Sequence, residues 1–172
     1  GKRPVIVNNQ FCPVVGAKTT DSRFVRADPA GNIVTVFFDG RVRSKNLGTW
    51  SGEQFFALKN ITGDATPEYG YFDKNHLYVY NNNGSLVYDY VPDGEASDQI
   101  QFFEDGTGKN LIGLHLTIAD QLIILNENGE VESGFPVKGN TSFIKYHSTT
   151  DRAEYLVTGS SSNKLLIYRK TN

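Results

Sequence analysis

Oxygen-bearing side chains gather in one polar loop of the sequence. Glu104, Asp105, Thr107 and Asn110 stand close together there. Calcium is a hard cation that needs several oxygen ligands, usually in a run of the form D-x-[DN]-x-[DN]-G. The alternation of that run is broken here, and again around Asp151. The pattern therefore favours an ordinary polar turn over a calcium site, and we predict no metal ligand.

The histidines and the single cysteine also lack a metal-binding pattern. His76, His115 and His147 are separated by 39 and 32 residues, without the H-x-x-x-H or H-E-x-x-H spacing of a metal site. We interpret them as strand or turn residues. The lone Cys12 excludes an intramolecular disulfide and a cysteine-rich zinc site. It is expected in a first inner strand, packed as a small buried side chain.

Catalytic patterns are equally weak. No G-x-S-x-G elbow occurs, and the Gly-Thr-Gly-Lys run at 106–109 is too short for a phosphate-binding loop. Glycoside cleavage needs two carboxylates that face each other across a site. Four acidic residues stand in loops between predicted strands: Asp28, Asp64, Asp105 and Asp151. Because such loops are polar in most β proteins, we predict neither catalytic nor cofactor-binding residues.

The composition narrows the class of protein. The 172 residues are 38% hydrophobic, 12% aromatic and 21% charged, which allows a single domain with a real core. Lysine plus arginine total 17 against 19 acidic residues, a net charge of −2. This balance lacks the basic excess typical of nucleic-acid binding, and no apolar run is long enough to span a membrane. A start at Gly1 and the lack of methionine favour a processed or truncated chain.

Short apolar runs rich in β-branched and aromatic residues recur along the chain, whereas helical periodicity is weak. The runs lie at 5–7, 33–38, 77–80, 86–88, 122–125 and 165–168. Asp-Gly or Asn-Gly pairs end at Gly40, Gly84 and Gly129, and such pairs suit the positive φ of tight hairpin turns. The sequence therefore predicts an all-β fold.

The three turn glycines recur with an even period. The first two are 44 residues apart and the later two are 45 apart. Residues 76–87 align with 121–132, and 163–168 repeat the same strand once more. A period of about 40–45 residues with several strands per unit indicates a β-propeller, in which each sheet, or blade, must stack on its neighbours.

Each unit divides into as many as four strands. We predict strands at 55–59, 69–73, 76–81 and 85–91, at 100–104, 110–119, 121–126 and 130–137, and at 142–147, 154–159 and 164–170. The last unit lacks an outer strand, which residues 4–8 would supply. We therefore predict four blades, closed by Val5-Ile6-Val7 beside residues 165–168, because strand exchange removes exposed edges. The alternative is a piece of a larger propeller, completed by missing sequence or by a second copy.

Aromatic side chains mark the expected contacts between blades. Phenylalanines head successive inner strands at Phe55-Phe56, Phe102-Phe103 and Phe143. Trp50 lies in a Gly-Thr-Trp-Ser-Gly loop and is the best candidate for an exposed recognition aromatic, although we favour a packing role. Tyr69 and Tyr71 fit either the core or the surface.

The repeats also resemble a known family. Residues 151–168 run from an acidic loop through a short apolar strand, a glycine and a polar turn to another apolar strand, and this resembles the propeller repeats of the integrin-like FG-GAP and quinoprotein-like groups. The segment 128–143 looks like the NG-x-x-x-x-GFP phrase of bacterial propellers, found in C-terminal modules of exported Bacteroidetes-like proteins. The resemblance covers most of 55–170. It implies a propeller fold and a periplasmic or cell-surface setting, but no activity.

We therefore expect residues 1–172 to form a single β-propeller domain. Its expected role is a non-catalytic module that binds a protein or small ligand within a larger exported bacterial protein, with recognition carried by loops on rigid blades. Two alternatives stay open: an enzyme of glycosidase or quinoprotein type with a site at the channel mouth, and a degenerate calcium-stabilised structural module. No cofactor, nucleic-acid partner or membrane insertion is expected.

Overall fold

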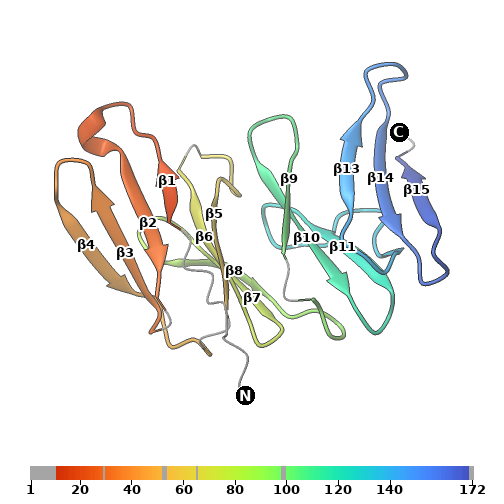
Figure 1. Cartoon of the computed structure of the whole chain (residues 1–172), viewed down its shortest axis with the longest axis horizontal. Coiled ribbons are helices and arrows are strands. Elements are labelled where there is room, and N and C mark those ends of the chain that lie inside the picture. The colour runs from red at the N-terminus through yellow and green to blue at the C-terminus, as the bar shows by residue number, and fades with distance from the viewer. Residues whose placement is uncertain (1–10, 29, 52–53, 65, 98–99, 171–172) are drawn as a thin grey trace. The chain divides into compact units, whose positions relative to one another are not determined.

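The chain folds into four antiparallel β-sheets, each built from strands that are consecutive in sequence (Figure 1). This computed structural model describes residues 11–28, 30–51, 54–64, 66–97 and 100–170. The chain divides into two compact units: one comprises 1–60 and 64–90, the other 61–63 and 91–172.

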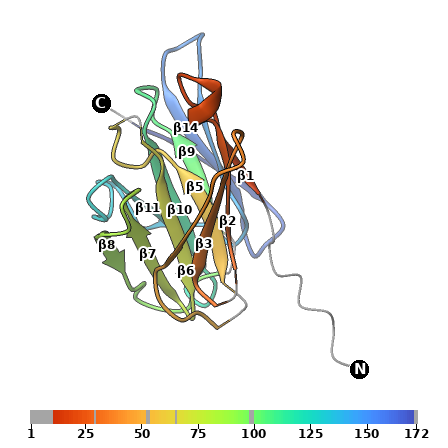
Figure 2. The same cartoon turned by 90° about the vertical axis from the view of Figure 1, so that its left-hand side faces the viewer.

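The first unit contains two four-stranded sheets (Figure 2). Sheet 1 consists of β1 (Cys12–Val14), β2 (Arg23–Ala27), β3 (Asn32–Phe37) and β4 (Val42–Asn46), and a 3-10 turn η1 (Thr19–Asp21) joins its first two strands. Sheet 2 consists of β5 (Phe55–Lys59), β6 (Glu68–Asp73), β7 (His76–Tyr80) and β8 (Leu86–Tyr90). Gly40 and Gly84 have φ values of 88° and 80°, as their Asp-Gly and Asn-Gly turns predict.

Sheet 1 contributes aliphatic residues to the core of this unit, and sheet 2 contributes aromatic ones. The core comprises Val25, Ala27, Ile33, Phe56, Tyr69 and Tyr71. Trp50 stacks on Tyr71 with ring centroids 4.5 Å apart and planes 6° apart. Trp50 is therefore a packing residue, as favoured from the sequence, and the two tyrosines belong to the core. Cys12 lies in the first strand, half-buried against this cluster, and burial raises the pKa of its thiol.

The second unit contains the other two sheets. Sheet 3 consists of β9 (Gln101–Glu104), β10 (Asn110–Leu116), β11 (Gln121–Leu125) and β12 (Val137–Lys138). Sheet 4 consists of β13 (Ile144–His147), β14 (Glu154–Gly159) and β15 (Leu165–Arg169). Their facing sides form one cluster of buried residues: Leu111, Leu122, Ile124, Phe143 and Leu156.

A glycine makes the contact between sheets 3 and 4 possible. The rings of Phe103 and Phe143 lie 5.0 Å apart, and a Cβ on Gly113 would come within 2.5 Å of the first and 2.6 Å of the second. Any larger residue at this position would displace the ring pair. The expected packing of inner-strand phenylalanines between sheets is confirmed for Phe56, Phe103 and Phe143. Phe143 directly precedes β13.

The predicted repeat units are confirmed as sheets, with strand bounds close to those expected, and sheet 4 has three described strands. The predicted outer strand 130–137 is wrong. One bridge joins Val131 to Leu125, and the ladder resumes only at Val137, because the intervening segment turns away and Pro136 has no N–H to donate. Residues 4–8 lie outside the described residues, so closure by them stays a prediction, as does the grouping of 1–172 into one domain.

Candidate functional site

Two adjoining hollows lie on sheets 3 and 4 of the second unit. The first has a volume of about 390 Å³ and a floor built from Leu111, Ile124, Phe135, Val137, Leu156 and Tyr168. The second, of about 660 Å³, is lined by the inner strands and the β9–β10 turn. Lys145 and Glu154 line both hollows. These two side chains therefore form the boundary between them.

The register of sheet 4 explains which side chains reach the hollows. Lys145 lies opposite Leu156, which lies opposite Tyr168, so one cross-strand row presents a lysine, a leucine and a tyrosine. The next row places His147 beside Glu154, and the backbone N–H of Lys170 donates to the Glu154 carbonyl at 2.9 Å. Alternation along strands puts both rows on the same face. That face combines apolar surface with charged groups.

The first hollow exists because the chain leaves sheet 3 early. The N–H of Glu132 still donates to the Ile124 carbonyl of β11 at 2.8 Å, but ladder pairing then stops until Val137. The residues of this interruption line the hollow: Glu132, Ser133, Gly134 and Phe135. The Tyr168 hydroxyl donates to the Lys138 carbonyl at 2.8 Å, which ties sheet 4 to the point where the outer strand resumes. The hollow is thus a gap between the two sheets, bordered by this loop.

Ion pairs fix the charged rim of the first hollow. The Nζ of Lys145 lies 3.0 Å from Oε1 of Glu154, and the Nζ of Lys170 lies 3.9 Å from its Oε2. Lys145 is largely buried, whereas Lys170 is 62% exposed. The second contact is long and solvated, and such pairs contribute little. Lys170 is therefore a cation that can turn to an incoming anion without breaking a buried bond.

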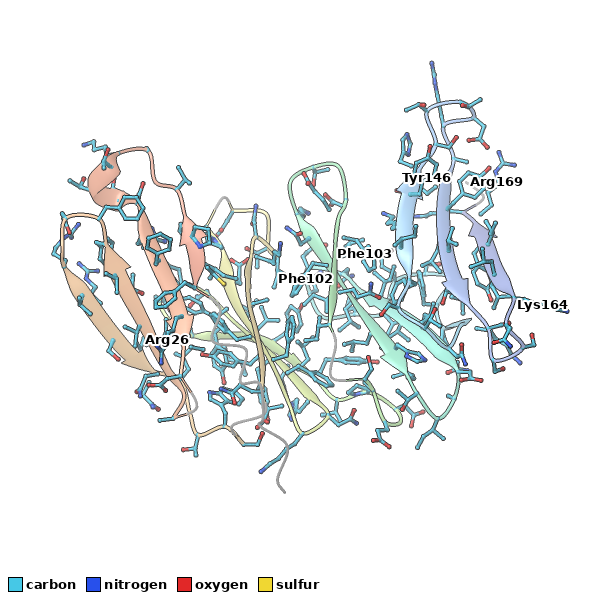
Figure 3. The ribbon with its side chains drawn as sticks, viewed as in Figure 1. Arg26, Phe102, Phe103, Tyr146, Lys164 and Arg169 are labelled. Carbon is cyan, nitrogen blue, oxygen red and sulfur yellow. The ribbon has the colours of Figure 1, made fainter. Side chains whose placement is uncertain are left out.

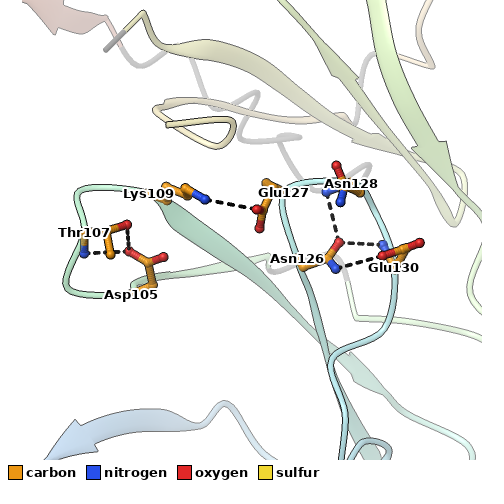
Figure 4. Close-up of polar contacts among 7 residues, drawn as sticks. All are labelled: Asp105, Thr107, Lys109, Asn126, Glu127, Asn128 and Glu130. Atoms are coloured by element: carbon orange, nitrogen blue, oxygen red, sulfur yellow. Dashed lines mark hydrogen bonds and ion pairs between the residues drawn. The ribbon is translucent and has the colours of Figure 1, made fainter. Parts of the chain in front are cut away.

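The second hollow contains the acidic loop that the calcium hypothesis concerns. Figure 4 shows that Asp105 accepts hydrogen bonds from Thr107, from its N–H at 2.8 Å and its hydroxyl at 2.7 Å. In the same view Lys109 pairs with Glu127 at 3.0 Å. The hydrogen bond from Thr107 is the main cause that lowers the pKa of Asp105. The loop is therefore a hydrogen-bonded polar turn, as the sequence favoured.

The other predicted acidic residues are engaged in their own loops. Asp28 accepts from the N–H of Asn32 at 2.9 Å, and Asp64 accepts from that of Thr66 at 2.8 Å. Asp151 is hydrogen-bonded to Ser148 and to the Tyr155 hydroxyl, which lower its pKa to about 2. The four carboxylates thus act as turn residues, and only Asp105 lines a described hollow. The geometry that glycoside cleavage requires is not built from them.

The histidines lie in strands, as interpreted from the sequence. His76 begins β7, with its Nε2 2.7 Å from Asp89, and burial lowers the pKa of His115 within β10. His147 ends β13 and lines the second hollow. Among residues 11–170 as far as the structure describes them, no three His, Cys, Asp or Glu side chains are grouped to hold a metal ion. None of the described helical segments is long and apolar enough to cross a membrane.

Sequence reasoning missed Lys145 and Lys170, and it considered Glu154 only beside Asp151 as a candidate oxygen ligand for calcium. A partial signal was present, because each of these charged residues stands within or beside a short apolar run of the last unit. That position in the sequence does not say which strands lie side by side. The site became visible only when the register put the three residues on one face.

Solved structures with similar folds place the chain in a class. It is similar to BBS1N in complex with ARL6DN, with a TM-score of 0.60 and 12% identity, over 92% of this chain and 49% of that chain. It is also similar to virginiamycin B lyase from Staphylococcus aureus, with a TM-score of 0.52 and 14% identity, over 94% of this chain and 57% of that one. The chain thus spans about half the length of these structures.

These likenesses show the fold alone. The similar structures are β-propeller-like proteins, so the four sheets of this chain are those of an all-β, propeller-type fold, as the repeat period predicted. Catalytic and non-catalytic proteins both occur among them, and fold does not decide between the two. The sequence matches no protein-family model and no curated protein.

Proposed function

We propose that this chain is a non-catalytic propeller module that binds a small ligand or a partner's peptide segment in the first hollow. The observation that carries the proposal is the hollow itself: about 390 Å³, with an apolar floor and a few charged groups at its rim. Ligand pockets generally have volumes of roughly 300–1,000 Å³ and this same mixture of surfaces. The hollow lies between two sheets, which hold its walls in place.

The lining suggests the chemistry of the ligand. An apolar group would cover Leu156 and Phe135, and the lysines at the rim would contact a negative charge beside it. Lys145 is already paired with Glu154 at 3.0 Å, whereas Lys170 is only 3.9 Å from that carboxylate. Lys170 is therefore the principal contact for the anion. The ligand class is an apolar side chain or ring that carries an acidic group.

The carboxylates of the second hollow support binding rather than catalysis. An enzymatic alternative would use Glu104, Asp105 and Glu154, which line that hollow together. A general acid needs a raised pKa, but the Thr107 hydrogen bond lowers the pKa of Asp105. Glu154 is paired with Lys145. Asp105 therefore lacks the environment of a general acid in this structure.

The setting of the module is part of the same proposal. We place it in a larger exported bacterial protein, on the resemblance of residues 128–143 and 151–168 to bacterial propeller repeats. The half-length overlap with the similar structures supports a role within a larger assembly. Fractionation of cells that produce the natural protein tests the setting: a cytoplasmic product would contradict it.

Binding can be tested with 8-anilinonaphthalene-1-sulfonate, an apolar ring system with one negative charge. In two-dimensional amide NMR, the probe should shift the signals of Ser133, Leu156 and Tyr168 at low occupancy. Ser133→Trp should weaken binding there because Ser133 is an exposed loop residue at the hollow, and an indole would fill the space. Lys170→Ala should weaken it about fivefold, the loss of roughly 1 kcal/mol of contact.

Matched controls lie at the other end of the same hairpin. Ser161→Trp and Lys164→Ala change exposed residues of the β14–β15 turn and should leave the shifts and the affinity unchanged. Shifts confined to other residues, or equal affinity for Ser133→Trp, contradict the proposed pocket. Hydrolysis of aryl glycosides by the wild-type chain, abolished by Glu154→Gln or Glu104→Gln, would contradict the non-catalytic assignment.

A further inference from the structure

Sheet 4 carries an apolar face opposite the one that presents Lys145, Leu156 and Tyr168, and we call it the forward face. In register across the sheet, Ile144 pairs with Val157, which pairs with Ile167, and Gly159 pairs with Leu165. Ile144, Leu165 and Ile167 are 61%, 74% and 65% exposed. Tyr146 and Arg169, labelled in Figure 3, lie on this face at β13 and β15. Four large apolar side chains are thus exposed together.

The repeat shows how unusual this exposure is. Leu165 and Ile167 occupy the positions of Leu122 and Ile124 one unit earlier. Those residues are 0% and 2% exposed, because Phe143 and Leu156 of sheet 4 pack on them. In each case the first and third apolar residues of the third strand point to the same side. The forward face of sheet 4 therefore has the composition of a sheet face that is covered by the next sheet.

The first unit shows the same rule. Ile33 of sheet 1 aligns with Leu122 and is 2% exposed, in one cluster with Phe56 and Tyr71 of sheet 2. The forward face of sheet 1 is thus covered by sheet 2, just as that of sheet 3 is covered by sheet 4. Within each unit, the forward face of one sheet therefore packs against the sheet that follows it in sequence. Large exposed apolar patches on a sheet commonly mark an interface.

A complementary surface exists on the opposite side of sheet 1, its backward face. Phe24 pairs with Val36 there and aligns with Leu156, which pairs with Tyr168 in sheet 4. Leu156 is 7% exposed beneath sheet 3, whereas Phe24 is 40% exposed. Val42, opposite Val36, is 63% exposed. Arg26, labelled in Figure 3, lies on the same backward face.

We propose that the forward face of sheet 4 binds the backward face of sheet 1 in a second copy of this chain. The pairing repeats the contact that sheets 3 and 4 already make, so no new type of surface is required. Two copies supply eight sheets, within the four to eight of known propellers. In a closed two-fold dimer this contact occurs twice, because sheet 4 of each copy meets sheet 1 of the other.

Sedimentation equilibrium of the full 172-residue chain over a dilution series tests the proposal. The wild-type chain should form a dimer, and Ile167→Lys should raise its dissociation constant by about tenfold or more, because the ammonium would be buried in both contacts. Ile118→Lys is the matched control: Ile118 is 79% exposed in the β10–β11 turn, away from the forward face, and the change should leave association unaltered. Circular dichroism verifies that each variant is folded.

A mixing experiment tests the head-to-tail pairing. Ile167→Lys and Phe24→Glu should each be monomeric alone, at a concentration at which the wild-type chain is dimeric. Mixed in equal amounts they should associate, because one contact then pairs the lysine with the glutamate and the other is wild type. A dimer formed by two forward faces would give no such rescue. A monomeric wild-type chain overturns the proposal, whether its own residues or a different protein cover the face, and so does a dimer that Ile167→Lys leaves intact.

Discussion

The side-chain amide of Gln101 forms two hydrogen bonds with the backbone of Phe143. Its Nε2 donates to the Phe143 carbonyl at 2.8 Å, and the Phe143 N–H donates to its Oε1 at 2.9 Å. One residue of β9 thereby satisfies both backbone groups at the residue that precedes β13. The contact joins sheets 3 and 4 and positions the Phe143 ring against Phe103.

Removal of this double hydrogen bond should destabilise the second unit. Gln101→Leu leaves the N–H and the carbonyl of Phe143 without their partner, and we expect a loss of about 1–3 kcal/mol in the free energy of unfolding. Urea denaturation followed by circular dichroism measures it. Gln101→Glu keeps an acceptor for the N–H and should lose less. Equal stability of Gln101→Leu and wild type would show that the pair contributes nothing net.

A methyl group at Gly113 should disturb the ring pair above it. Gly113→Ala places a Cβ within 2.6 Å of both Phe103 and Phe143, and overpacking of this kind costs about 1–3 kcal/mol. Phe143→Leu removes part of the obstruction, so the double variant should be more stable than the sum of the two single losses predicts. Strict additivity in a double-mutant cycle would argue against the predicted clash.

Trp50 should stabilise the first unit through its stack on Tyr71. Trp50→Leu removes a ring whose centroid lies 4.5 Å from that of Tyr71, and we expect a loss of about 2–4 kcal/mol, somewhat below a fully buried tryptophan. Trp50→Phe retains an aromatic face and should lose less. Because Trp50 is the only tryptophan in the chain, its fluorescence reports on this unit in the parent protein, and circular dichroism compares the variants.

The acid–base behaviour of Tyr155 should depend on Asp151. The hydrogen bond to Asp151 raises the pKa of Tyr155, because the carboxylate stabilises the neutral phenol over the phenolate. Asp151→Asn should therefore move the pKa of Tyr155 downward, toward 10, in a titration of the ring by NMR. An unchanged or higher value for Tyr155 in Asp151→Asn contradicts the prediction.

The reciprocal shift gives a pH dependence at low pH. Ser148 and Tyr155 lower the pKa of Asp151 to about 2. A depressed carboxyl pKa means that the contact is fully present above the unfolded value, near 3.8, and is lost as the pH falls through about 2. The chemical shift of the Tyr155 ring should therefore change in that acidic window and not near neutrality. A change centred above pH 4 would contradict it.

The strand pattern and the turns were predictable because they depend on local preferences. Alternating β-branched and aromatic residues favour extended backbone, and Gly40 and Gly84 have the positive φ that their turns require. The outer strand at 130–137 was wrong for the opposite reason: its composition suits a strand, but only pairing with β11 could have made it one, and the segment after Val131 turns away. The interruption of pairing with β11 leaves space for the first hollow, which residues 132–135 line.

The amino-acid sequence specifies the repeat and most strands within each unit, since these follow from spacing along the chain. It did not determine which apolar face is covered. Leu122 and Leu165 stand at equivalent positions in the repeat, yet one is 0% and the other 74% exposed. Burial depends on the presence of a second surface, and the meeting of Lys145 with Glu154 depends on register between strands. The burial of a sheet face and the Lys145–Glu154 contact are therefore properties of the folded sheets, which spacing along the chain does not specify.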